Sequence, residues 1–350
     1  MPNKHQFINR IIRAPEDFSS IAGARGKDNA YFACEELGEF SPQAAELRGW
    51  KTAQEDAMLL ASAHIDQPQN FFIKLFENFN AQITDNNTGS TASMYYFNPQ
   101  TLQITTANLG DSRVYLTIKT QDDSEEEEDN KKVAKYVTFL LTEDHNLEVE
   151  RIKKHIEANN GKIIQGRVDL TLNVGGAIGD IEIPSLLKSP DLATFQIDQL
   201  LKLANIQTTN YEIILTTACD GLTNKKRDYN HEFSVKFREN QKFPEWVDEK
   251  TNDNYQETLK QQATLSKLIE IYDQDSREDK GELANFLANN ANQNVQGDNI
   301  SVCTVRLKSD KLCVGSPPFV SAVFDGHGGD AVSKKCLNIM KLELERIKEN

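Results

Sequence analysis

Short segments rich in β-branched and aromatic residues dominate this chain, and they limit the folds that it can adopt. Gly, Asn, Asp or Pro bounds each segment, which is typical of β-strands separated by turns. Residues 71–83 and 148–158 carry apolar residues at three-to-four spacing, which predicts helices, and 331–348 is a third helix candidate. Because strands and helices do not alternate regularly, the pattern predicts an α+β fold, an antiparallel β-sandwich with helices packed outside. The predicted strands are 94–97, 103–108, 113–119, 134–141, 212–217, 300–307 and 319–324.

Composition and charge exclude several classes of protein. The 350 residues contain no internal repeat and no linker, so we expect a single domain spanning 1–350. No apolar run approaches the roughly 20 residues of a membrane-spanning helix, and residues 1–13 lack the apolar core of a secretory signal. A net charge of −14 should repel nucleic acid and anionic membranes. We therefore expect neither nucleic acid nor a membrane as a partner.

The cysteines and the polar segments carry weaker signals. Five widely separated cysteines form no Cys-x-x-Cys pair, which predicts reduced thiols in a cytoplasmic protein, and the sequence leaves export to another compartment open. We expect the protein to act as a monomer. The acidic run at 122–129 is more typical of a solvated hairpin tip than of a metal or partner site. Residues 228–280 are polar and predict a helical surface segment or an insertion.

Acidic residues lie at the ends of several predicted strands, beside glycine or another polar residue. Carboxylates in such positions are held by a rigid sheet and still reach solvent, and Mg²⁺ and Mn²⁺ take oxygen ligands. Two such ions about 3.5–4 Å apart can share a carboxylate and a bridging water, which becomes a hydroxide able to attack phosphorus. A nearby imidazole can protonate the departing alkoxide. These acidic residues are Glu55, Asp56, Asp111, Asp220, Asp298 and Asp325.

The Asp-Gly-His-Gly-Gly motif at 325–329 is the most specific of these signals. A single Asp-Gly after a strand is usually a turn. Three glycines around one aspartate and one histidine are costly for stability and are hard to explain as a turn. The residues alone therefore predict a hydrolase that uses divalent metal ions.

Together these motifs resemble the metal-dependent protein phosphatases, the PPM family of type-2C serine/threonine phosphatases. The resemblance runs from about residue 49 to the C-terminus. It implies a central antiparallel β-sandwich flanked by helices on both outer faces, and a mobile flap between 179 and about 209. The matching motifs are 49–57, 89–92, 107–113, 141–145, 150–152, 179–180, 220–221, 298–299 and 325–329.

The resemblance also implies a role for each metal ligand. Asp325 would bridge two Mn²⁺ or Mg²⁺ ions, and the Gly326 carbonyl would bind one of them. Asp220 and Asp298 would ligate the other ion. Glu55 and Asp56 would hold metal-bound waters. Asp111, acting with Asp220, would contribute to a third and weaker metal site.

The same resemblance implies hydrolysis of phosphoserine and phosphothreonine in phosphorylated protein substrates. His327 would be the general acid, and Lys51 would bind the substrate phosphate where the family usually has an arginine. A lysine cannot make the bidentate contact of an arginine, so we expect weaker phosphate binding. The alternative is a catalytically weak pseudophosphatase that acts as a binding or regulatory module; Lys51 and the pair Gly175-Gly176 are its main support. A metal-dependent hydrolase for another phosphoester is a further alternative.

The order of the motifs departs from the family. The strand that carries Asp-Gly-His-Gly-Gly would normally follow the Glu-Asp strand, and here residues 309–350 place this strand and its helix at the end of the chain. A natural transposition, an engineered rearrangement and fragments numbered out of covalent order would each give this sequence. For Asp325 to reach Asp220 and Asp298, the C-terminal strand must insert beside residues 58–63.

Overall fold

Two β-sheets pack face to face in the computed structural model, which describes residues 30–33, 40–47, 53–84, 88–121, 134–223, 255–277, 282–293, 298–312 and 316–349. The first sheet has six strands, paired antiparallel except for the parallel pair β1 and β3. Its order is β1 (Ala30–Ala33), β3 (Ala57–Ser62), β15 (Phe319–Phe324), β5 (Ala92–Asn98), β6 (Gln103–Leu109) and β12 (Asp191–Gln196).

The second sheet has five strands, all antiparallel to their neighbours. Side chains along its strands alternate between two apolar layers, because successive residues of a strand point to opposite faces. In β7, for example, Leu116 faces the other sheet whereas Tyr115 faces the outer helices. The strand order is β2 (Ser41–Leu47), β14 (Ile300–Lys308), β13 (Tyr211–Ala218), β7 (Arg113–Gln121) and β8 (Ala134–Leu140).

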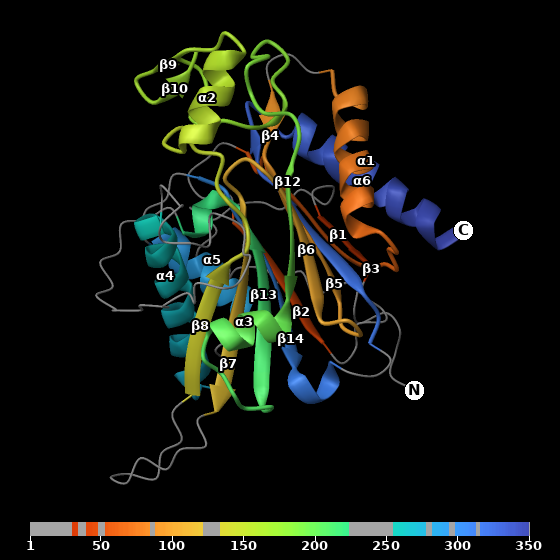
Figure 1. Ribbon diagram of the computed structural model, residues 1–350, viewed down its shortest axis with the longest axis vertical. Helices are drawn as coiled ribbons and strands as arrows, with labels where there is room; N and C mark the ends of the chain where they lie inside the picture. Colours follow the sequence, from red (N-terminus) through yellow and green to blue (C-terminus); the bar gives the residue numbers. More distant parts are fainter. Residues whose placement is uncertain are drawn as a thin grey trace.

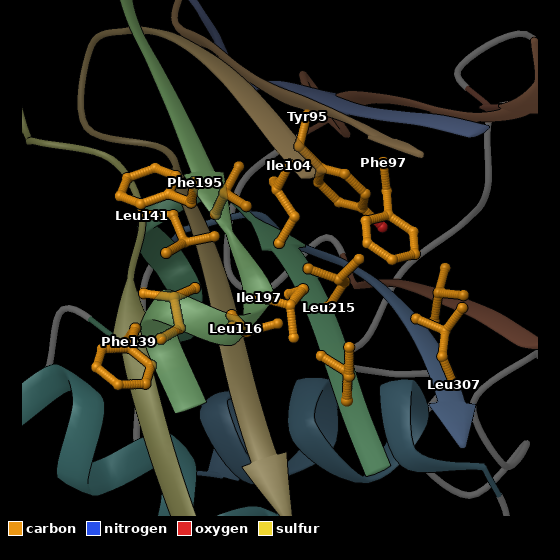
Figure 2. Packing of buried hydrophobic residues seen from close by; sticks show 14 of the residues in the cluster. Tyr95, Phe97, Ile104, Leu116, Phe139, Leu141, Phe195, Ile197, Leu215 and Leu307 are labelled. Carbon is orange, nitrogen blue, oxygen red and sulfur yellow. The ribbon is translucent and has the colours of Figure 1, made fainter. Parts of the chain in front are cut away.

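Apolar side chains from both sheets form the central core. Figure 2 shows Tyr95 and Phe97 from the six-stranded sheet above Leu116 and Leu215 from the five-stranded sheet. Phe319 lies among aromatic rings in this layer, with ring centroids 5.9 Å from Tyr95 and 5.6 Å from Phe97. Burying such side chains is the dominant stabilising contribution to a fold of this kind.

Helices cover both outer faces of the sandwich (Figure 1). On the six-stranded sheet, α1 (Pro68–Gln82) and α6 (Ala331–Glu349) bury apolar residues such as Phe76 and Met340. On the five-stranded sheet, α4 (Tyr255–Gln274) and α5 (Leu283–Gln293) bury residues such as Leu265 and Leu287. The predicted α+β sandwich with helices on both outer faces is therefore confirmed.

The C-terminal strand lies in the interior of the six-stranded sheet. Strand β15 pairs with β3 on one side, where Val320 is opposite Ala61, and with β5 on the other, where Val320 is opposite Tyr96. This insertion beside residues 58–63 was expected from the sequence, and the strand register agrees with it. Strand β15 ends at Phe324, directly before Asp325.

A small subdomain lies at one end of the sandwich (Figure 1). It contains α2 (Glu150–Ala158) and the hairpin of β9 (Ile163–Ile164) and β10 (Arg167–Val168), packed around residues such as Ile152 and Leu186. The range 179–209, expected to contain a mobile flap, also contains regular structure, and the flap stays a prediction. Residues 191–196 form β12 against β6, and α3 (Ile197–Leu203) buries apolar residues in the central core.

The polar and acidic segments of the chain differ in how far the structure describes them. The polar segment 228–280 contains α4, which packs on the sheet through Leu265 and Ile269 and is thus more than a surface helix. The acidic run at 122–129 lies outside the described residues. Among the described residues, none of the helices combines the length and apolar character needed to cross a bilayer.

Candidate active site

A third, three-stranded sheet begins the candidate site. Its central strand β4 (Gly89–Ser90) pairs with β16 (Gly326–His327) on one side and with β11 (Ile178–Gly179) on the other. The backbone at Asp325 is also fixed, because its carbonyl accepts hydrogen bonds from Thr91 N–H (2.9 Å) and Ser90 Oγ (3.1 Å). The glycine-rich motif is thus a strand edge with a defined register, not a free turn.

Five aspartates meet at the same end of the sandwich because of where their strands begin or end. Asp56 directly precedes β3, and Asp325 directly follows β15. Asp220 follows β13 as the first residue of the 3₁₀ helix η2 (Asp220–Leu222), Asp298 precedes β14, and Asp111 lies in the turn between β6 and β7. Carboxylate oxygens of Asp220 and Asp325 lie within 4.8 Å of each other, together with the Cys219 sulfur.

Asp56 is the most deeply buried of these carboxylates. Burial raises its pKa to about 7; the charge of Asp298 adds to this effect, whereas a hydrogen bond from Ser301 opposes it. Ser301 Oγ donates to Asp56 Oδ2 at 2.7 Å. The other oxygen, Oδ1, has no hydrogen-bond partner within the described part of the chain. A buried, unpartnered carboxylate oxygen is costly unless a cation or a proton satisfies it.

Mutual repulsion extends across the cluster. Burial, followed by the charges of Asp56 and Asp111, raises the pKa of Asp325 well above its usual range. Burial, followed by Asp111 and Asp325, raises the pKa of Asp220 in the same direction. Asp220 and Asp325 remain partly accessible, whereas Asp56 is fully buried. These oxygen-only donors are of the type that Mg²⁺ and Mn²⁺ take, and their charge excess favours cation binding.

Cys219 is close to the carboxylates but has a different role. Its burial raises the pKa of the thiol well above its usual range, so the thiol stays protonated. Its sulfur donates to the Asn299 carbonyl (3.4 Å) and accepts from Ser301 N–H (3.1 Å). The burial and the hydrogen bonds indicate a structural thiol rather than a metal ligand.

Arg113 lies beside the acidic cluster and was missed by the sequence argument. Its buried guanidinium donates to both carboxylate oxygens of Asp144, with Nε–Oδ1 at 2.9 Å, and to Thr223 Oγ1 at 2.8 Å. Its charge also lowers the pKa of Asp111, although burial and Asp144 raise that pKa overall. An arginine at the first position of a buried strand was the available signal, since such a residue needs a buried acidic partner.

The glycine at 326 is required by a backbone approach. A Cβ there would overlap the carbonyl oxygen of Glu55. The same carbonyl accepts a hydrogen bond from Ser333 Oγ at the start of α6, and Glu55 N–H donates to Asn299 Oδ1 at 2.8 Å. The half-buried Glu55 is therefore fixed between the Asp298-Asn299 turn and the C-terminal segment.

His327 is also fixed, through a contact that the sequence argument did not assign. Its Nε2 donates to Asp180 Oδ2 at 2.6 Å. Asp180 directly follows β11, on the opposite side of β4 from His327. The predicted site residue Lys51 lies outside the described residues, so the phosphate-binding prediction stays a prediction.

Comparison with known proteins gives the family. The sequence model described as Protein phosphatase 2C matches residues 13–231, more than half of the chain. This chain belongs to the protein phosphatase 2C family. The matched range includes Asp111 and Asp220, whereas Asp298 and the motif at 325–329 lie beyond it. In this PP2C chain, the fold brings those later residues back to the same cluster.

Individual relatives are more distant. The PP2C chain is 30% identical over 146 residues to an Arabidopsis thaliana protein named "Probable protein phosphatase 2C 60", and the match covers 39% of this chain and 33% of that protein. The chain thus spans about one third of this relative. A C. elegans sex determining protein is 18% identical with a TM-score of 0.46, covering 78% of this chain and 66% of that one. The serine-threonine phosphatase 2C of Toxoplasma gondii is 17% identical with a TM-score of 0.37, covering 68% and 63%.

Proposed function

We propose that this PP2C-family protein is a metal-dependent phosphatase that hydrolyses phosphoserine and phosphothreonine in protein substrates. The observation that carries the proposal is the convergence of five aspartates at one end of the sandwich, with the buried Asp56 Oδ1 unpartnered within the described residues. Such a cluster is unstable without compensating positive charge. Family membership supports the same reaction class.

In this proposal the cluster holds two Mn²⁺ or Mg²⁺ ions. Asp325 would be shared by both ions, the Gly326 carbonyl would help to hold one, and Asp220 and Asp298 would hold the other. When bound, such ions supply an activated water for attack on phosphorus and neutralise the charge of the phosphate. Glu55 and Asp56 would hold metal-bound waters, and Asp111, acting with Asp220, would contribute to a third and weaker site.

The chain's own residues perform the remaining tasks. His327 protonates the departing serine or threonine oxygen, and its contact with Asp180 at 2.6 Å holds the ring at the edge of the metal cluster. Lys51 attracts the phosphate as a single point charge, so we expect a higher KM than an arginine would give. The cytoplasmic location, the monomeric state, and the single domain with 309–350 as its displaced segment stay predictions.

The decisive experiment replaces one ligand and leaves its shape intact. Asp220→Asn should abolish Mn²⁺-dependent release of phosphate from a phosphothreonine peptide, because an amide cannot supply the lost negative charge. The matched control is Asp198→Asn, which makes the same change on the exposed surface of α3 and should keep wild-type activity. Wild-type turnover by Asp220→Asn would refute the assignment.

The pseudophosphatase alternative makes a different prediction. It requires weak or absent metal binding, whereas the described residues retain every metal-binding carboxylate expected from the family. The Gly175-Gly176 pair, which supported that alternative, has a packing explanation: a Cβ at Gly175 would overlap Ile152 of α2. Calorimetric titration with Mn²⁺ separates the two functions, since heat of binding that disappears in Asp220→Asn supports the phosphatase.

A further inference from the structure

His327 and Asp180 form a hydrogen-bonded pair in which the carboxylate holds the imidazole ring in place. We infer that Asp180 is a positioning residue for His327: its carboxylate accepts the Nε2 proton, fixes the imidazole ring and its tautomer, and leaves Nδ1 to serve the leaving group. The inference rests on the proposed function, because it assumes that His327 is the general acid. Asp180 is buried, whereas His327 is partly exposed and can therefore reach a substrate.

The register of the small sheet places the two side chains together. Gly89 of β4 is opposite His327 of β16 on one side and opposite Gly179 of β11 on the other. A Cβ at Gly89 would overlap both Asp180 Oδ2 and His327 Nε2. The absence of a side chain at Gly89 is thus what allows a strand to pass beneath the His327–Asp180 hydrogen bond.

Asp180 is held in an uncommon backbone conformation. Its φ is 44° and that of Gly179 is 79°, so two consecutive residues are in the left-handed region. Such conformations persist at functional sites only where the surroundings impose them. Here Asp180 N–H donates to the Thr88 carbonyl at 3.0 Å, which ties the turn to β4.

Lys188 stabilises the same turn from the other side. Its Nζ donates to the Gly179 carbonyl at 2.6 Å and to the Ala177 carbonyl at 3.1 Å. Burial lowers the pKa of this lysine to about 8, and the charge of Asp180 partly offsets that effect. A partly buried lysine that binds the carbonyls of Ala177 and Gly179 holds the backbone directly before Asp180. It fixes the position from which Asp180 reaches His327.

A second aspartate–histidine pair shows what a purely structural arrangement looks like in this chain. His145 is fully buried; its Nε2 donates to Asp191 at 3.0 Å, and its Nδ1 accepts from Gly110 N–H at 3.2 Å. Both ring nitrogens are thus used within the fold. In His327 only Nε2 has a partner within the described residues, so Nδ1 is the nitrogen that remains for chemistry.

The proton balance of the step follows from this assignment. The step starts with a proton on each ring nitrogen of His327. The bond between phosphorus and the serine oxygen breaks, its electron pair stays on that oxygen, and the Nδ1 proton of His327 converts the oxygen to the alcohol, while the Nε2 proton stays on the ring. The attacking water forms the new bond to phosphorus and releases a proton to solvent. His327 then regains one proton from solvent, so the ring returns to its starting state.

The kinetic test separates substrates by their leaving groups. Asp180→Asn should lower kcat for a phosphoserine peptide by about 10-fold or more, a fraction of the roughly 100- to 10,000-fold that a general acid contributes. For p-nitrophenyl phosphate kcat should change by less than about 2-fold, because p-nitrophenolate leaves without a proton. His327→Gln should show the same split. The double variant should lose little more than either single variant, because the two residues act as a unit.

The matched control makes the same chemical change in the same backbone conformation. Asp169→Asn replaces an exposed aspartate whose φ is 48°, within the small subdomain. It should leave both rates at wild-type values. Asparagine tolerates the left-handed region well, so Asp180→Asn is expected to fold.

A second measurement does not depend on activity. Nitrogen-15 NMR of the histidine rings, recorded on the metal-free protein and assigned with His327→Gln, should show His327 with its proton on Nε2. In Asp180→Asn that preference should be lost, because an amide can either accept or donate. Equal loss on both substrates, no loss on the peptide, or an unchanged His327 spectrum would overturn the inference. A wild type inactive on both substrates would contradict the proposed function instead, and the NMR result alone would then decide whether Asp180 sets the tautomer.

Discussion

Removing metal should make the stability of this protein depend on pH in an unusual direction. The contribution of Asp56 alone can be worked out, because burial raises its pKa from 3.8 to about 7. Because the folded-state pKa of this acid lies above the unfolded-state value, the folded protein binds the proton more tightly. The stabilising contribution is present below about pH 4 and is lost as pH rises from about 4 through about 7.

The size of the effect follows from the shift. One pKa unit corresponds to about 1.4 kcal/mol, so full ionisation of Asp56 costs the folded state roughly 4 kcal/mol. Between about pH 5 and about pH 7.5 the expected loss is about 2 to 3 kcal/mol. Mn²⁺ should reverse the trend, because the ionised carboxylate is the form that a cation stabilises.

Urea unfolding in EDTA at these two pH values measures the loss. Asp56→Asn should remove its share of the pH dependence and should be more stable than the wild type at the higher pH without metal, while gaining less from Mn²⁺. The amide oxygen can still accept the hydrogen bond from Ser301. Asp66→Asn, at a side chain that is 88% exposed, should behave as the wild type. If Asp56→Asn keeps the wild-type pH dependence, the reasoning from burial is wrong.

Three further substitutions test the geometry. Gly326→Ala should lower the rate of phosphate release by about 10-fold or more and the free energy of unfolding by about 1–3 kcal/mol, because the new Cβ forces β16 away from the Glu55 carbonyl. Wild-type kinetics in this variant would contradict the contact. Arg113→Met should lower the free energy of unfolding in urea by about 3–5 kcal/mol, since Asp144, only 13% exposed, loses its buried partner. A loss below about 1 kcal/mol would count against this ion pair. Phe319→Ala should lower the free energy of unfolding by about 3–5 kcal/mol. The control Leu342→Ala, at a residue that is 53% exposed on α6, should lower it by less than about 0.5 kcal/mol. Similar losses in the two variants would mean that β15 is not in the core.

Elements with a strong local signal were predictable from the sequence. Strand β15 and helix α1 combine dense apolar or β-branched residues with clear boundaries, and both form where expected. Strand β2 was missed because its sequence, Ser-Pro-Gln-Ala-Ala-Glu-Leu, has no β-branched or aromatic residue. Its strand state comes from pairing with β14, a long-range contact that local composition does not contain.

The candidate site also has residues that the sequence could name and residues that it could not. The carboxylates could be named because each follows or precedes a strand and belongs to a short motif. The supporting roles of Asp180 and Lys188 could not, because they depend on contacts that only the fold creates. Asp180 bonds to a residue 147 positions later, and Lys188 acts through backbone carbonyls that any residue could provide. Sequence motifs therefore named the candidate ligands, whereas the contacts that hold these residues in place required the fold.

The C-terminal segment shows why chain order matters less than sheet register for such a site. Asp325 and His327 reach the cluster because β15 lies between β3 and β5, whichever part of the chain supplies it. The Ser333–Glu55 hydrogen bond joins residues 278 positions apart and connects the end of the chain to the start of β3. Closing so long a loop costs little more entropy than closing a moderate one. It follows that the site is complete only after the last strand has docked, so metal binding should stabilise the packing of that segment together with the cluster itself.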